Sequence, residues 1–415
     1  MDTLTRRRFL TASGVTAAGA LAAGLHWRSV EDLFTAAKHD PLPPGAGVLV
    51  LVTLSGGNDG LNTVIPYADP AYHDARSELA YAASEVRRLD GSVGLNPAMK
   101  GLEDLWRQRR LAVVRGVGYP NPDRSHFRSM DIWQTASPDR PVTTGWIGRW
   151  LDATGADPLR AVSIGPVPPP LVAGERCAGA AVPLGRLAAP AGAVGRGISA
   201  MARPQPGEPA LQAAAAGGLA DLLRLEATYG PVVDPKTAGG PDEGHDDEQR
   251  TNGASAGGQS ALGGQLDVVA SCIAGRVPTR VYAVSLGGFD THANEKGTQS
   301  RLLGELDTAL TGFLHKVGTR PVVVAVYSEF GRRVHANASQ GTDHGTASDV
   351  LVLGPQVKGG MYGEQPSLTK LDHNGDLVAT TDFRDVYATL LERVLGTEAD
   401  RIVPGARRRI DFLAT

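Results

Sequence analysis

The sequence predicts an α/β fold in which a mostly parallel sheet carries helices on both of its faces. Five short apolar runs are bounded by turn residues, as the buried strands of a parallel sheet commonly are. Stretches with a helical pattern lie between these runs. Strands that alternate with helices are typical of βαβ units, whose crossover helices cover both faces of one sheet.

The elements follow one another in a simple order. An amphipathic segment near 29–38 and a Pro-Gly linker over 41–47 lead into the first apolar run. The strands are expected at 48–52, 111–114, 281–285, 322–327 and 350–353. The helices are expected at about 98–109, 145–153, 211–228, 260–275, 299–316 and 384–396, and a further helical stretch ends near Trp133.

The first 25 residues have the features of an export signal. Residues 5–10 read Thr-Arg-Arg-Arg-Phe-Leu, and a mildly apolar run follows from 11 to 25. That run is too short and too rich in Gly, Ala and Thr to cross a bilayer stably. We therefore expect residues 1–25 to be a signal peptide that the twin-arginine translocase reads, and the mature protein to be periplasmic or secreted, with no stable membrane span.

Composition narrows the class of protein. The length fits one large α/β domain or two smaller ones. The formal charge is −3 and the basic clusters after the signal are short, so no nucleic-acid binding is expected. Cys177 and Cys272 are the two cysteines, too few for a disulfide scaffold, and their pairing stays open. A segment over 165–210 is rich in Pro, Gly and Ala, and the acidic, Gly-rich stretch over 231–260 is expected to be a flexible insertion.

Polar residues capable of chemistry follow four of the five predicted strands, where open α/β sheets place their sites. They are Asp59 after the first strand, Arg124 and Ser125 after the second, Asp290 and His292 after the third, and Glu329 and Arg332 after the fourth; Asp343 and His344 precede the fifth. Carboxylate and imidazole groups are ligands that suit Zn²⁺, Mn²⁺ or Fe.

Each motif alone has a simpler interpretation. A Gly-Asn-Asp turn accounts for Asp59, and helix capping accounts for Ser125. Ser125 at a helix start, with Arg124 and His126 beside it, also fits an anionic substrate. So many ligand types at one sheet edge favour a metal site built from Asp59, Asp290, His292, Glu329, Asp343 and His344.

The motifs together resemble a known family, the twin-arginine-exported domain-of-unknown-function family 1501. The resemblance rests on residues 54–62, 124–127, 288–292, 328–332 and 341–345, and it spans about residues 46–396. That family in turn is similar to the superfamily of alkaline phosphatases, sulfatases and cofactor-independent phosphoglycerate mutases. Its members hold two metals at strand ends and use a Ser, Thr or modified Cys as nucleophile. The resemblance implies one alkaline phosphatase-like domain over 40–415.

Roles carried over from the superfamily fall on particular residues. Asp59 matches the first-strand aspartate ligand, Ser125 matches the nucleophile, and Asp290 with His292 matches an Asp-and-His pair that is usually spaced further apart. In one alignment Asp343 and His344 form the Asp-His-Gly ligand pair. In the other, which we favour, Glu329 takes that strand-end position and His344 is a later, single histidine ligand.

The function that the resemblance implies is that of an exported metal-dependent hydrolase of phosphate or sulfate esters. Its cofactor would be one or two divalent ions, Zn, Mn or Ca, beside a Ser125 nucleophile. Arg124 or Arg332 would neutralise charge on the transferred group, and the substrate would be a small anionic ester or polymer. The alternative is a non-catalytic binding or scaffold protein of the cell envelope that keeps a degenerate metal site.

Overall fold

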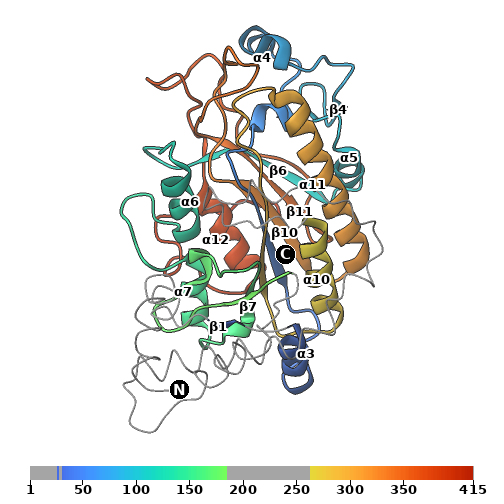
Figure 1. The fold of residues 1–415 in the computed structure, drawn as a ribbon, viewed down its shortest axis with the longest axis vertical. Helices are drawn as coiled ribbons and strands as arrows, with labels where there is room; N and C mark the ends of the chain where they lie inside the picture. Colours follow the sequence, from blue (N-terminus) through green and yellow to red (C-terminus); the bar gives the residue numbers. More distant parts are fainter. Residues whose placement is uncertain (1–25, 28–29, 185–261, 415) are drawn as a thin grey trace, which may run out of the picture.

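A ten-stranded sheet forms the centre of the computed structural model, which describes residues 26–27, 30–184 and 262–414 (Figure 1). Its strand order is β1-β8-β7-β9-β2-β10-β11-β6-β12, and β13 pairs with β6. The strands are β1 (His26–Trp27), β2 (Val48–Leu54), β6 (Leu111–Gly118), β7 (Ala161–Ile164), β8 (Ala180–Val182), β9 (Val281–Leu286), β10 (Val322–Ser328), β11 (Ser348–Leu353), β12 (Gly360–Tyr362) and β13 (Thr381–Asp382). A separate small sheet contains β3 (Val64–Ile65), β5 (Gly94–Leu95) and β4 (Arg87–Arg88).

Helices cover both faces of the large sheet. The described helices are α3 (Val30–His39), α4 (Pro70–Arg76), α5 (Lys100–Arg107), α6 (His126–Thr135), α7 (Trp146–Ala153), α10 (Leu262–Ala274), α11 (Glu295–Val317) and α12 (Phe383–Arg393). Helices α10 and α11 lie on one side of the sheet and α6, α7 and α12 on the other (Figure 1). The prediction of a mostly parallel sheet with helices on both faces is confirmed.

The two faces of the sheet belong to two separate cores. Along β2, Val48, Val50 and Val52 pack with residues of α5, α10 and α11, whereas Leu49 and Leu51 pack with residues of α6, α7 and α12. Successive side chains of a strand point to opposite faces, so a strand covered on both sides must be apolar at every position. This is why the central strands read as continuous apolar runs in the sequence.

Strand direction decides which loops share an edge. Strand β10 runs parallel to β2, and β2 runs parallel to β9. Strand β11 is antiparallel both to β10 and to β6, so β6 points the same way as the others. The carboxyl ends of β2, β6, β9 and β10 therefore meet at one edge of the sheet, together with the start of β11.

The predicted elements are confirmed within a few residues wherever the structure describes them, although α11 begins at Glu295 and not at 299. Strands β7 and β8 were not predicted, because runs of four and three residues give too little pattern. The predicted signal peptide over 1–25, the helix over 211–228, the insertion over 231–260 and the part of the Pro/Gly/Ala-rich segment from 185 onward lie outside the described residues.

Two further findings concern the cysteines and the membrane. Cys177 and Cys272 are both buried and both free. Among the described helices, none combines the length and the apolar character that a membrane span requires.

Candidate metal centre

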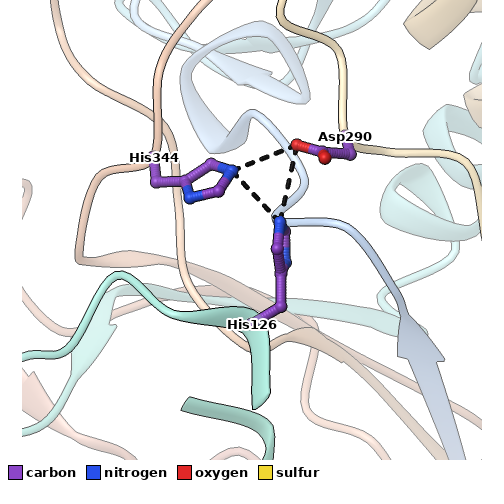
Figure 2. Close-up of side chains that lie close together, drawn as sticks. All are labelled: His126, Asp290 and His344. Carbon is purple, nitrogen blue, oxygen red and sulfur yellow. Dashed lines mark hydrogen bonds and ion pairs between the residues drawn. The ribbon is translucent and has the colours of Figure 1, made fainter. Parts of the chain in front are cut away.

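Three ligand-type side chains converge at the shared edge of the sheet. Figure 2 shows His126 at the start of α6, Asp290 in the loop after β9 and His344 in the loop before β11 pointing toward one another. His344 Nε2 lies 3.1 Å from Asp290 Oδ1 and 3.1 Å from His126 Nε2. His126 Nε2 lies 3.5 Å from Asp290 Oδ1. We call these three residues the ligand cluster.

The outer nitrogen of each imidazole is bound to an acceptor. His126 Nδ1 lies 2.8 Å from Glu329 Oε1, and His344 Nδ1 lies 2.9 Å from the carbonyl oxygen of Arg124. A carbonyl oxygen only accepts, so Nδ1 of His344 carries a proton. Glu329 also accepts hydrogen bonds from the Gly56 amide and the Ser328 hydroxyl, which identifies its carboxylate as the acceptor toward His126.

This arrangement leaves lone pairs facing one another at the centre of the cluster. With Nδ1 protonated, the Nε2 atom of a neutral imidazole is an acceptor, and Asp290 Oδ1 is an acceptor as well. Three acceptors within 3.5 Å of each other repel unless a metal ion or a proton lies among them. A histidine ligand whose second nitrogen donates to a carboxylate or a carbonyl is the usual arrangement at metal sites, so the donor set fits a divalent metal.

Electrostatics at the cluster follow from these contacts. The hydrogen bond to the Glu329 carboxylate raises the pKa of His126, although burial opposes it. Burial lowers the pKa of His344 and so favours its neutral form, which binds metals. Burial tends to raise the pKa of Asp290, but the hydrogen bond and the positive charge of the Arg332 guanidinium bring it below its usual value.

Backbone pairing holds the two loops around β10 and β11 in place. The Gly331 amide donates to Thr346 at 2.8 Å, and the Gly345 amide donates to Gly331 at 2.9 Å. Gly56 has a φ of +118°, and a Cβ atom there would lie 2.5 Å from the Asp290 nitrogen. The loop after β2 therefore approaches the Asp290 loop as closely as only glycine permits.

The predicted ligands fall into three groups in the structure. Asp290 and His344 belong to the cluster. His292 lies at its rim, with Nδ1 3.0 Å from Asp290 Oδ1 and a half-exposed ring. Glu329 and Asp343 were alternatives for one role, and the structure places neither in the cluster: Glu329 orients His126, whereas Asp343 is exposed and accepts from Asn337 at 3.2 Å.

Asp59 lies apart from the cluster, in a buried ion pair. Its Oδ2 is bound by Arg76 Nη1, and both side chains are fully buried. Burial, with the nearby Asp59 charge, raises the pKa of Glu295 to about 9, so Glu295 is protonated at neutral pH. The charge that balances Asp59 here is a guanidinium, in place of the metal that the sequence predicted.

Arg332 has a different position from the one expected for a residue that contacts substrate. It is 1 % exposed, and Nη2 reaches Asp290 Oδ1 at 2.7 Å. Its other contacts are backbone carbonyls: Nε donates to Gly57 at 2.6 Å and Nη1 to Thr342 at 2.9 Å. Arg332 thus orients Asp290 and ties three loops together, and its burial leaves it no access to a transferred group.

Ser125 and Arg124 remain accessible beside the cluster. Ser125 is the exposed N-cap of α6, but its side chain makes no capping hydrogen bond. Its amide donates to Asp123 Oδ1 at 2.7 Å. The Arg124 side chain is 31 % exposed and pairs with Asp376.

Sequence reasoning treated His126 only as a possible contact for an anionic substrate. The Ser-His pair at the start of a helix that follows a buried strand was the available signal. Because the ring of His126 packs 4.9 Å from that of Phe330 and 4.3 Å from that of His344, its role depends on residues more than 200 positions away.

Residues 243–408 match the model of the family described as "Protein of unknown function (DUF1501)". No curated protein matches the chain.

Several solved structures are similar at low identity. The C-terminal periplasmic domain of EcEptC from Escherichia coli, in complex with Zn, is 11% identical over 75% of this chain and 77% of that chain, with a TM-score of 0.37. A protein in the alkaline phosphatase superfamily from Vibrio parahaemolyticus is 10% identical over 85% and 68%, with a TM-score of 0.40. The lipoteichoic acid synthase LtaP from Listeria monocytogenes is 10% identical over 95% and 79%, with a TM-score of 0.36.

These TM-scores mark a remote likeness, whereas the family match covers Asp290, Glu329 and His344 directly. The model that matches residues 243–408 is that of the family which the sequence motifs indicated.

Proposed function

We propose that the protein is a metal-dependent hydrolase of phosphate or sulfate esters that holds a divalent cation, such as Zn²⁺, on His126, Asp290 and His344. One observation carries the proposal. The Nε2 atoms of His126 and His344 converge with a carboxylate oxygen of Asp290 on one point. The Nδ1–H groups of the same two rings already donate to Glu329 and to the Arg124 carbonyl oxygen. Three N and O ligands with room for a further one are typical of catalytic zinc sites.

The site is open to solvent on one side, as a catalytic site must be. The side chains of the ligand cluster are 31 %, 49 % and 24 % exposed for His126, Asp290 and His344. A divalent cation held there would act as a Lewis acid on an ester oxygen and lower the pKa of a nucleophilic hydroxyl.

The residues next to the cluster supply the remaining functions. Ser125 precedes a ligand and has a hydroxyl with no capping bond, so it is the proposed nucleophile. It stands at the N-terminus of α6, whose partial positive charge favours an anion. The partly exposed guanidinium of Arg124 is the cation placed to neutralise charge on the transferred group.

A pocket with a volume of about 270 Å³ is lined by residues from loops near the cluster, although by none of the three ligands. Asp123, Phe330 and Thr346 line it, and they come from the same loops as the ligands and their partners. Phe330 also packs against the rings of His126 and His344 at 4.9 Å. The organic part of an ester bound at the cluster would occupy this pocket.

The test is the metal content of the mature protein, purified without chelators and without a His-tag, beside a His344→Ala variant. About one equivalent of metal, lost in the variant, is expected from the three-ligand set. A folded protein without metal would refute the hydrolase and favour the non-catalytic binding protein. Ser125→Ala should then keep the metal and lose hydrolysis of nitrophenyl esters; hydrolysis at the wild-type rate would exclude Ser125 as nucleophile.

We further propose that residues 1–25 direct export through the twin-arginine translocase, which leaves the mature protein in the periplasm or outside the cell. The support is the Arg-Arg pair at residues 6 and 7 with Phe9 and Leu10 after it. Replacing both arginines by lysine should trap the precursor in the cytoplasm. Unchanged export of that variant would contradict the proposal.

A further inference from the structure

A fully buried carboxylate outside the ligand cluster lies between two arginines that belong to the cluster's loops. Asp376 is 0 % exposed. Its Oδ2 lies 3.2 Å from Arg124 Nε, and its Oδ1 lies 3.5 Å from Arg333 Nε. Neither oxygen has a regular hydrogen-bond partner among the described residues. The two guanidinium groups are therefore what compensates the buried charge.

Each of these arginines holds the His344 loop through its backbone. The carbonyl oxygen of Arg124 accepts the Nδ1 proton of His344 at 2.9 Å. The amide of Arg333 donates to the carbonyl oxygen of Asp343 at 3.0 Å. The residue before His344 and the imidazole itself are thus both fixed by residues whose side chains contact Asp376.

A closed turn presents the Asp376 carboxylate in a fixed position. Asp372 Oδ1 accepts from the amides of Asn374 and Asp376 at 2.8 and 2.9 Å. Gly375 allows the turn with a φ of +80°. These hydrogen bonds hold the backbone of Asp376, and with it the carboxylate that the two arginines contact.

We propose that Asp376 is a positioning residue for the metal centre. By fixing Arg124 and Arg333 it keeps the Arg124 carbonyl oxygen on His344 Nδ1, so that His344 Nε2 presents its lone pair to the metal. This inference rests on the proposed metal-dependent function. Removal of a group that orients a metal ligand commonly lowers the metal affinity by about tenfold to a hundredfold.

Asp376→Asn in the mature protein tests the proposal, because it removes the charge and keeps the shape. Metal affinity is measured by competition with a chromophoric chelator, and the site geometry by the visible absorption of the Co²⁺-loaded protein. We expect Co²⁺ affinity to fall about tenfold or more, with a changed spectrum. Asp307→Asn is the matched control, since Asp307 is a buried carboxylate that accepts from the amides of Gly101 and Leu102 in α5 and, among the described residues, from no residue of the cluster.

A second readout does not depend on the metal. In the metal-free protein, ¹⁵N NMR of the imidazoles reports which nitrogen of His344 carries the proton. The Nδ1–H form should dominate in the wild type and in Asp307→Asn, and a mixture should form in Asp376→Asn. If no variant binds metal, the proposed function fails, but this tautomer difference would still support the role of Asp376.

Arg124→Gln keeps the backbone carbonyl and removes the guanidinium, so it tests the route of the effect even if Asp376→Asn does not fold. Its loss of metal affinity should match that of Asp376→Asn, and the double variant should lose little more. Unchanged affinity and an unchanged His344 tautomer in Asp376→Asn or in Arg124→Gln would overturn the proposal. Fully additive losses would overturn it as well.

Discussion

Glu329→Gln probes the central feature of the site, the carboxylate that accepts the Nδ1 proton of His126. The bond is 2.8 Å long and charge-assisted, and Glu329 is 1 % exposed. Hydrogen bonds to charged groups contribute about 1.5 to 3 kcal/mol, and neutral ones contribute roughly half of that. Glutamine keeps an acceptor for His126 and loses the charge. The difference, about 0.8 to 1.5 kcal/mol, corresponds to a loss of roughly fourfold to thirteenfold in metal affinity.

The surroundings of Glu329 indicate that glutamine fits without disturbing the fold. With its amide oxygen in the position of Oε1, glutamine still accepts from His126 and from the Gly56 amide. Its NH₂ group then faces Ser328 Oγ, which has a second acceptor for its own proton in the Leu54 carbonyl oxygen at 2.6 Å. The fold should therefore be kept while the ligand basicity falls.

The assay is competition for Zn²⁺ between the mature protein and a chromophoric chelator, with thermal unfolding of the metal-free protein as the measure of folding. Glu103→Gln is a suitable control, because Glu103 is a buried carboxylate paired with Arg87 and Arg107 and not with the ligand cluster. Zinc affinity within twofold of the wild type in a folded Glu329→Gln protein would refute the reasoning on His126.

Three further predictions test the surroundings of the site. Asp59→Asn leaves Arg76 buried without its partner, so the free energy of unfolding, measured by denaturant titration, should fall by about 3 to 5 kcal/mol. The metal stoichiometry should stay the same. Loss of metal with unchanged stability would show instead that Asp59 is a ligand. Burial raises the pKa of Asp349 from 3.8 to about 7, so the folded state holds the proton more tightly and this group's contribution to stability falls as the pH rises from about 4 to about 7. Asp349→Asn should therefore be more stable than the wild type at pH 8, by up to about 4 kcal/mol, and no more stable than the wild type at pH 4. If the free energies of unfolding of the two proteins change in parallel with pH, this prediction is wrong. Gly56→Ala places a side chain at a φ of +118° and against the Asp290 amide. The backbone strain alone should lower the free energy of unfolding by about 1 to 3 kcal/mol, and Zn²⁺ binding should weaken. A variant with the wild-type melting temperature and zinc affinity would contradict the close approach of the two loops.

The difference between the predicted ligands and the residues of the ligand cluster has a physical cause. Asp290 and His344 were found from sequence because they stand in Gly-rich loops next to buried strands, and strand ends are where an α/β sheet gathers polar groups. Glu329 was found by the same argument, but its carboxylate faces His126 Nδ1 and not the centre of the cluster. The pattern of polar residues after apolar runs predicts which edge of the sheet carries the site. The direction of each side chain within its loop depends on residues from other loops.

The ion-pair partner of Asp59 could not be predicted from any local pattern in the sequence. It follows a strand as Asp290 does, yet Arg76 from α4 pairs with it inside the protein. An arginine 17 residues further on, in a helix away from any strand end, gives no sign in the sequence that it will neutralise this carboxylate. Asp376 was missed for the same reason, since its two arginine partners lie in loops more than 40 and 250 residues away.

The sequence by itself determined the central strands β2, β6, β9, β10 and β11, most of the described helices, the mostly parallel character of the sheet, the resemblance to the family, and the set of loops from which the site is drawn. These follow from apolar periodicity and from short motifs, which are local properties of the chain. The tertiary structure decided that β11 runs antiparallel and so brings His344 to the edge where four other strands end. It also decided that His126 completes the cluster and that Asp59 does not, because lone pairs and charges find their partners only when distant loops are packed together.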